Sequence, residues 1–541
     1  MVDVNALLKG HEKAKKYRDA FTDTWRDAGD YVRPVRDDIA ITEESETTPN
    51  RRKFDALYDT TAREANITYA AGCMSWMTPS ETNWFSFDPP EYLSDNDDVK
   101  SWYSVCTDET RRILAGSNFY SRIHEIYLDD GAFGTSAIAI EEDSRFGVRF
   151  EALPIGTYSI LENNKREVDT VFRELKLTPK QAAEEFGEEN LAKDVQEQLR
   201  ANSDEKRLYL HISMPRSDAD RIAGKIDGEN LPWAVYYIDT KDKKLVRESG
   251  TWENRIPVHR HLLWGCGPYG IAPGVMVLPD ARQLNAMQEY LDALVQKQVT
   301  PPVLLPERFK GKVNLNAGGH TFFKSDGEKP QFWQNPGNYL VGEDRVEFRR
   351  NQINRAFHVD LFQALASVPV GKEMTAAEIH MRQRDRLTLF SPTFGRKNTE
   401  LNTPIMRCVF AILLRAGAFP DPPANLIQEG PDGLPFLPDP EINYTSRLSL
   451  QIKAIHNESL LRTMEMVGPM ASVAPDMIDH LDLDSVTRGV ARNEGVPESW
   501  LRPEREVAEL REARAREQAR IQMQLEVVEQ AEAQAKLQKA G

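Results

Sequence analysis

Two amphipathic helices separated by a Pro/Gly-rich insert constrain the fold of this chain more than any other feature of its sequence. The first is predicted over 276–300, with an apolar seam that extends along about 30 Å of helix. The seam residues recur at steps of three and four: Leu284, Met287, Leu291 and Leu294. The second is predicted over 346–366, with a seam at Val346, Ile353, Phe357, Leu361 and Leu365. Because apolar seams must be buried, we expect both to pack against other helices.

The insert between the two helices, 301–345, is predicted to be compact and β-rich. Glycine and proline turns separate short strand candidates at 303–305, 320–324 and 331–333. Six basic and five acidic residues give the insert a balance of +1, which contrasts with the net charge of -16 of the whole chain. Its basic cluster is a candidate surface for a protein partner, and the alternative is a solvated loop: Arg308, Phe309, Lys310 and Lys312.

After the second helix, the sequence predicts a short loop and then mainly helices. Proline and glycine interrupt the pattern in 367–374, and Thr375 to Glu378 have the spacing of a capping box that begins the next helix. Helices broken by prolines continue to 502. From 503 to 541 the composition shifts to Ala, Glu, Arg and Gln, which predicts one helix of about 57 Å.

The first 275 residues predict an α+β region. Helical periodicity extends from the N-terminus to Val32 and through 56–77, 97–129 and 179–200. Apolar runs or alternation predict strands at 137–141, 148–153, 168–177, 208–214, 233–239, 244–249 and 256–263. The whole chain is therefore predicted to be α+β and predominantly helical. Its 541 residues are too many for one core, so we expect several compact parts.

Composition and charge limit the classes of function. Hydrophobic residues at 40% and charged residues at 28% indicate a folded chain rather than a disordered one. The balance of 68 Lys+Arg against 84 Asp+Glu argues against nucleic-acid binding through a broadly basic surface. The apolar run 409–414 is far shorter than the roughly 20 residues that span a membrane. The N-terminus lacks an apolar signal core, so we expect assembly in the cytoplasm and no membrane partner.

Apparent site motifs in the sequence lack the context that their chemistry requires. Gly265 to Gly270 spell GxGxxG, but Pro268 and Pro273 oppose the helix that a dinucleotide loop needs, so a turn is expected. His259 and His261 would face one side of a strand, yet no nearby Cys or third His completes a metal site. The four cysteines are far apart and are expected to be free thiols. No GxxxxGK[ST], GxSxG or HExxH sequence occurs, so we predict no catalytic residue, metal or cofactor.

Five blocks, in order along the chain, resemble the portal proteins, or head-to-tail connectors, of short-tailed (podovirus-type) bacteriophages. They are YDTTAREANITYAAGCMSWMTPSETNWFSF (58–87), LDDGAFGTSAIAIEED (128–143), VDTVFRELKLTPKQAAEEFG (168–187), PDARQLNAMQEYLDALVQKQVTPP (279–302) and KEMTAAEIHMRQRDRL (372–387). The resemblance implies a portal fold assembled as a ring. Its parts would be a wing (1–275), a first stem helix (276–300), a clip (301–345), a second stem helix (346–366), a tunnel loop (367–374), wing and crown helices (375–502) and a C-terminal barrel helix (503–541).

The resemblance also implies function and partners. A ring of subunits, a dodecamer in this family, would form the channel for packaging and ejection of double-stranded DNA at the capsid vertex of the virion. The partners would be the terminase large subunit, then tail adaptor and nozzle proteins, with capsid, scaffolding and internal core proteins around the ring. An acidic channel would let DNA pass without holding it, since several cationic phosphate contacts already bind tightly.

Two groups of site residues follow from the resemblance. In the tunnel loop, the residues expected to contact DNA are Val368, Pro369, Val370, Gly371, Lys372 and Glu373. The alternative there is an ordinary connection between helices. In the clip, Arg308, Phe309, Lys310 and Lys312 are expected to dock partners. The C-terminal helix is expected to form a barrel with its neighbours, or else to be a single solvated helix.

Two other functions remain open on the sequence. The first is a ring-forming head-completion or tail adaptor protein, although such adaptors are usually shorter and lack the order of stem, clip, stem and crown. The second is a nuclease, which would need a compact cluster of metal-binding carboxylates. Scattered carboxylates do not make such a site, so we predict that the protein is not an enzyme.

Overall fold

The computed structural model describes residues 3–34, 57–93, 96–145, 147–217, 221, 225, 227–263, 265, 267–299, 303–304, 331–332, 339–366, 392–429, 435–446, 449, 463, 465–466, 482–493, 502 and 504–540. The chain divides into two compact units. The first contains Met1–Ser80 and Arg112–Ala416, and the second contains Glu81–Arg111 and Gly417–Gly541.

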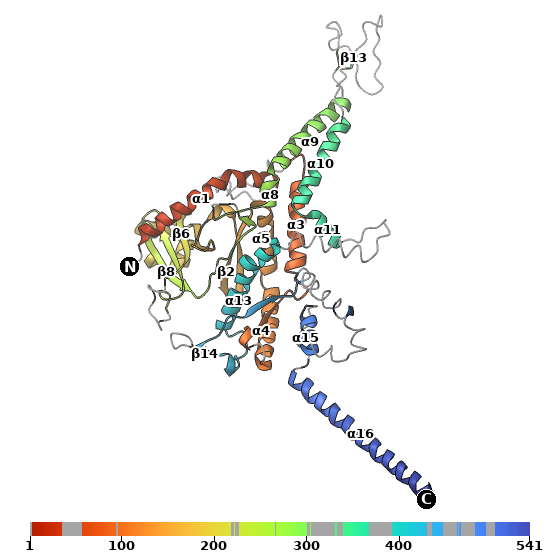
Figure 1. The fold of residues 1–541 in the computed structure, drawn as a ribbon. Coiled ribbons are helices and arrows are strands. Elements are labelled where there is room, and N and C mark those ends of the chain that lie inside the picture. Colours follow the sequence, from red (N-terminus) through yellow and green to blue (C-terminus); the bar gives the residue numbers. More distant parts are fainter. Residues whose placement is uncertain are drawn as a thin grey trace. The chain divides into compact units, whose positions relative to one another are not determined.

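A five-stranded antiparallel sheet forms one layer of the first unit (Figure 1). Its strands, in spatial order, are β4 (Tyr158–Glu162), β5 (Val168–Leu177), β6 (Arg207–Pro215), β7 (Trp233–Asp239) and β8 (Lys244–Thr251). Side chains alternate between the two faces, so Leu210 and Ile212 join one buried cluster and Tyr209 joins another. Helix α1 (Val4–Tyr31) contributes Ala14 to the first cluster. Helices α6 (Pro179–Phe186) and α7 (Lys193–Arg200) cover the other face, where Phe186 packs beside Tyr209.

A smaller antiparallel sheet holds strands in the order β3 (Gly147–Leu153), β2 (Thr135–Asp143) and β9 (Val258–Arg260). Helix α5 (Phe119–Phe133) packs against β2, β3 and helix α3 (Thr61–Met77). Gly134 joins α5 to β2 with a φ of 78°, the left-handed conformation that favours glycine after a helix. A Cβ there would also lie 2.4 Å from the backbone nitrogen of Ala272. The end of α5 is therefore fixed, with Asp130 in its last turn.

Helices α9 (Leu278–Val299) and α10 (Tyr339–Ala356) lie side by side and project from the rest of the first unit as a hairpin (Figure 1). The predicted seams turn inward. Leu284, Val346, Ile353, Phe357 and Leu361 are buried, and Met287, Leu291 and Leu294 are half-buried. Gly342 allows close contact between the helices, because a Cβ there would lie 2.7 Å from Cδ2 of Leu291. The prediction that the seams pack against helices is confirmed for these residues.

The second helix of the hairpin differs from the single helix predicted over 346–366. Helix α10 begins at Tyr339 and ends at Ala356, and a separate helix, α11 (Val359–Ala366), follows. The break lies at His358, whose φ of 55° is left-handed and costs a residue with a Cβ roughly 1–2 kcal/mol. Phe357 and Phe362, on either side of the break, are both buried. Tertiary packing of these rings therefore outweighs the helical periodicity on which the prediction rested.

Most other elements before α9 agree with the sequence analysis, with four differences. The helix predicted over 179–200 is two helices, α6 and α7, separated by a 3-10 turn at Glu188–Asn190. The helix predicted over 97–129 is two helices, α4 (Asp97–Gly116) and α5, because Ser117 and Asn118 interrupt it. The strand predicted over 256–263 is also two, β9 and β10 (Leu262–Leu263). Strand β4 was not among the predicted strands.

Within the insert, β12 (Val303–Leu304) pairs antiparallel with β13 (Gln331–Phe332), as two of the three strand candidates predict. The third candidate, 320–324, lies outside the described residues. In the second unit, β1 (Phe85–Asp88) pairs antiparallel with β16 (Glu441–Tyr444). Helix α15 (Leu483–Asn493) precedes α16 (Glu504–Ala540), which confirms the helix predicted from 503 onward.

Candidate functional site

Polar contacts attach the α9/α10 hairpin to the segment that precedes α3. The side-chain oxygen of Asn285 on α9 accepts a hydrogen bond from the backbone N–H of Tyr58 at 2.7 Å. Arg350 on α10 donates to the carboxylate of Asp59 from Nε at 3.0 Å and from Nη2 at 2.7 Å. Each helix of the hairpin therefore has its own attachment, which fixes the direction in which the hairpin leaves the first unit.

The same hairpin exposes large apolar side chains away from its seams. Tyr290 and Val299 on α9 are 72% and 76% exposed, and Phe348 on α10 is 58% exposed. Exposed large apolar side chains of this kind are suited to contact other protein surfaces.

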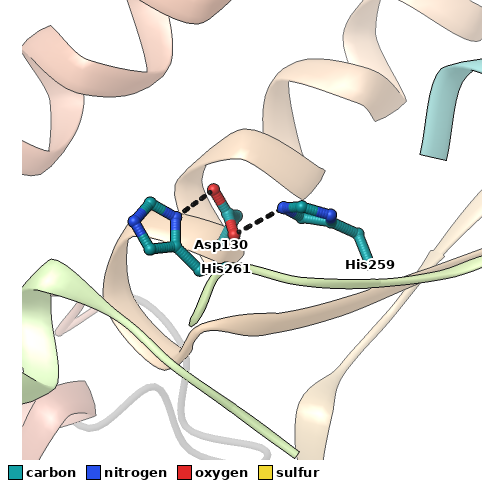
Figure 2. A group of neighbouring side chains, drawn as sticks. All are labelled: Asp130, His259 and His261. Carbon is teal, nitrogen blue, oxygen red and sulfur yellow. Dashed lines mark hydrogen bonds and ion pairs between the residues drawn. The ribbon is translucent and has the colours of Figure 1, made fainter. Parts of the chain in front are cut away.

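A buried polar cluster lies where α5 meets β9. The carboxylate of Asp130 is between two imidazoles (Figure 2). Its Oδ1 is 3.1 Å from Nε2 of His259, and its Oδ2 is 3.2 Å from Nδ1 of His261. All three side chains are buried. The sequence analysis is confirmed in expecting both histidines to face one side of the chain.

Two further side chains complete this cluster, which we call the Asp130 cluster: Tyr69, Asp130, His259, His261 and Lys397. The hydroxyl of Tyr69 donates to Oδ2 of Asp130 at 2.8 Å. The ammonium of Lys397 forms an ion pair with the same oxygen and lies 3.5 Å from Nε2 of His259. Lys397 is fully buried and directly precedes a π-helix, Asn398–Asn402. Such π-helical turns are rare and often mark functional positions.

Electrostatic effects fix the charges in the Asp130 cluster. Burial alone would raise the pKa of Asp130, but the charge of Lys397, followed by His261 and His259, holds it well below its usual range. Burial lowers the pKa of His259, although Asp130 opposes this shift. Burial, and then the charge of Asp130, raise the pKa of Tyr69 well above its usual value. The cluster therefore holds a carboxylate and an ammonium as a buried pair, with His259 neutral.

Asp130, His259 and His261 have ligand atoms within 4.8 Å of one another, so we tested whether they fit a metal ion. They do not. The Lys397 ammonium already pairs with Oδ2 of Asp130 and adjoins Nε2 of His259, so a second cation would meet a buried positive charge. The prediction of hydrogen-bonding rather than metal-binding histidines agrees with this geometry.

The GxGxxG spelling at Gly265 belongs to a β-hairpin. Strand β10 pairs antiparallel with β11 (Gly270–Ile271), so Gly265 and Gly267 lie between two strands and Gly270 begins the second one. A dinucleotide loop would instead need a helix that begins at the glycines. The expected turn is therefore confirmed, and helix α8 (Pro273–Met276) begins only after β11.

The site residues predicted by resemblance lie outside the described residues: the clip residues Arg308, Phe309, Lys310 and Lys312, and the tunnel-loop residues Val368, Pro369, Val370, Gly371, Lys372 and Glu373. The sequence analysis singled out the two histidines of the Asp130 cluster but missed Asp130, Tyr69 and Lys397. Tyr69 and Asp130 each lie in a block that carries the resemblance. No sequence signal identifies Lys397, because its role depends on contacts with residues more than a hundred positions away.

Among the described residues, no helix has the length and apolar character needed to cross a membrane.

Comparisons with known proteins give consistent results. Residues 4–501 match the family described as bacteriophage head to tail connecting protein. The portal protein of Salmonella phage epsilon15 is 29% identical over 521 residues, which cover 94% of this chain and 91% of that protein. The probable portal protein of Bordetella phage BPP-1 is 27% identical over 541 residues, which cover 98% of this chain and 94% of that protein.

Solved structures give a weaker similarity. A chain from the virion of a native gene transfer agent particle covers 74% of this chain and 95% of its own length, with 12% identity and a TM-score of 0.34. A chain from the neck of an empty gene transfer agent particle matches 75% of this chain and 86% of its own length, with 11% identity and a TM-score of 0.38.

Proposed function

This chain belongs to the family of bacteriophage head-to-tail connecting proteins. From that membership we propose which role each segment of the chain has in a portal. It is a phage portal protein of the capsid vertex, where the portal is the channel for packaging and ejection of DNA. Portal proteins are structural connectors and not enzymes. The observation that carries this function is the family match, which spans 4–501.

We infer that the subunits assemble as a dodecamer in which neighbouring hairpins contact one another. The exposed side chains of Tyr290, Val299 and Phe348 support this arrangement, because contacts with neighbouring subunits would remove apolar surface from water. The wing would be 1–275, the stem helices 276–300 and 346–366, the clip 301–345, the crown 375–502 and the barrel helix 503–541. In this arrangement α16 contacts its counterparts in adjacent subunits.

The chain's net charge of -16 supports passage of DNA rather than its capture. Double-stranded DNA carries one negative charge per about 1.7 Å, and six to ten cationic contacts to its phosphates already give strong binding. A channel built from acidic subunits avoids such binding, so closure of the ring confines the DNA instead. Movement of the DNA is assigned to a separate terminase.

The clip is proposed to dock the terminase large subunit first and tail adaptor and nozzle proteins later. Changing Arg308, Lys310 and Lys312 to Glu should weaken both attachments while the ring stays closed, because rim charges act mainly on association between proteins. Packaging efficiency and the fraction of heads with joined tails measure the effect. A matched change of Lys13, Lys15 and Lys16 to Glu on α1 should leave both values unchanged. Normal packaging and tail joining in the clip variant would refute this surface.

The tunnel loop, 367–374, is proposed to face the channel and to narrow it around DNA through Val368 to Glu373. Deleting Val368 to Gly371 should widen the constriction but preserve the ring, and filled heads should then lose packaged DNA. Retained DNA per head and a cryo-electron map of the ring measure the two effects. A map with this loop on the outer rim, away from the axis, would exclude the assignment.

A further inference from the structure

Two chain segments that are distant in sequence meet at one side chain, Tyr69 on α3. Its ring centroid is 6.3 Å from that of Phe357 and 6.2 Å from that of Phe362, both in edge-to-face geometry. The Lys397 ammonium lies 5.3 Å from the same ring centroid. The hydroxyl of Tyr69 donates to Asp130. Tyr69 therefore contacts the chain both where it enters α11 and where it returns at Lys397.

Helix α11 is seated on α3 at Gly72, one turn beyond Tyr69. A Cβ on Gly72 would lie 2.3 Å from Cγ and Cδ1 of Phe362, a distance that atoms in contact do not tolerate. The Phe362 ring thus lies directly on the bare backbone of α3, and α11 lies beside α3 (Figure 1). The turn at His358 directs the chain to this position, since its carbonyl accepts hydrogen bonds from the N–H groups of Leu361 and Phe362.

The returning segment is held by a second set of contacts. Lys397 pairs with Asp130, and Glu400 of the π-helix accepts from the backbone N–H of Arg260 at 2.9 Å and from its Nη2 at 2.9 Å. Two charged side chains, three residues apart, thus bind neighbouring groups of α5 and β9. Because these partners are buried or half-buried, the segment cannot shift without breaking ion pairs away from water.

We propose that Tyr69 and Gly72 are positioning residues that hold both ends of the chain between α11 and Lys397 at one place on α3. Fixing two ends close together reduces the conformations open to the intervening chain. This inference rests on the proposed function, in which the intervening chain includes the channel loop 367–374. Under it, α3 determines where that loop is presented to DNA.

The test uses the full-length protein in assembled rings. Gly72→Ala should displace Phe362 and raise amide hydrogen exchange of residues 359–366 by about tenfold or more, since a loosened helix opens at lower free energy. Gly395→Ala is the matched control. Gly395 is also a helical glycine, but nothing lies within 4 Å of the added Cβ, so exchange should not change.

Two further variants separate positioning from a general loss of structure. Phe362→Ala adds no atoms and should itself raise exchange in 359–366, and Gly72→Ala should then add little, because the colliding ring is absent. Tyr69→Phe keeps the ring and removes only the hydroxyl. It should raise exchange around 397–402 more than in α11. Unchanged exchange in both Gly72→Ala and Phe362→Ala rings would overturn the proposal.

Retention of packaged DNA provides the functional readout. If α3 positions the channel loop, Gly72→Ala heads should lose DNA although their rings are closed, while Gly395→Ala heads should not. If Gly72→Ala raised exchange but DNA retention stayed normal, Tyr69 and Gly72 would still be positioning residues. The result would then contradict the assignment of 367–374 as the channel loop. The failure of the inference and the failure of the proposed function are thus distinguishable.

Discussion

Replacing Lys397 with Met should destabilise the first unit by about 3–5 kcal/mol, because it leaves the buried Asp130 carboxylate without its cation. Thermal unfolding of the full-length chain measures the loss. Replacing Asp130 with Asn in the same chain should recover part of it, since no unpaired charge then remains. Arg122→Met is the control, because Arg122 lies on α5, the helix that also holds Asp130. Its pair with Glu125 is partly exposed to solvent and should be worth about 1 kcal/mol or less.

The Lys397→Met defect should depend on pH in a defined direction. The charge of Lys397 is one cause that lowers the pKa of His259, and Asp130 opposes it. Without Lys397, the folded-state pKa of His259 rises, so protonated His259 can pair with Asp130. The unmodified protein has the lower folded-state pKa for His259, so a fall in pH destabilises it more than it destabilises the variant. The variant should therefore be closer to the unmodified protein at about pH 6 than at about pH 8. Equal stability of Lys397→Met and Arg122→Met at both pH values would contradict the buried pair.

Replacing Leu291 and Phe357 with Asp should abolish closed rings or prevent folding of the hairpin. Phe357 is fully buried beside Tyr69, and Leu291 packs on Gly342 of the facing helix. A carboxylate at either contact would be desolvated without a partner, and such core changes exceed about 4 kcal/mol. Electron micrographs of the purified protein, viewed along the ring axis, measure assembly.

The matched control places the same residue on the same hairpin but in water. Asn351 on α10 is exposed, so Asn351→Asp should form normal rings. If the Leu291 and Phe357 double variant also formed normal rings, the two seams would not be the contacts that build the stem.

Some of the fold could be predicted from the sequence because its signals are local. The three- and four-residue steps of Leu284 to Leu294 reflect one helix face, and the 3.6-residue period is set by backbone geometry alone. Strands β5 and β7 end where apolar runs end, so their predicted bounds agree with the structure. The family could be predicted as well, because five blocks keep their order along the chain.

The break at His358 could not be predicted in this way. Helical periodicity continues through Val346, Ile353 and Phe357 to Leu361, and a non-glycine residue gives no local reason for a left-handed φ. The turn is stabilised by the packing of Phe357 and Phe362 against Tyr69 on α3. Helix α3 is almost three hundred residues earlier in the chain. A contact between distant residues leaves no periodic trace in either segment.

The sequence by itself determined the order of helices and strands, the two apolar seams and the membership of a family, since these depend on local periodicity and on residue order. Only the tertiary structure decided what the polar residues do. His259 and His261 have the spacing of metal ligands, but the fold brings Lys397 into the same place, and its ammonium supplies the positive charge that Asp130 needs. Charges interact through space, so the meaning of a buried carboxylate is set by the neighbours that folding provides.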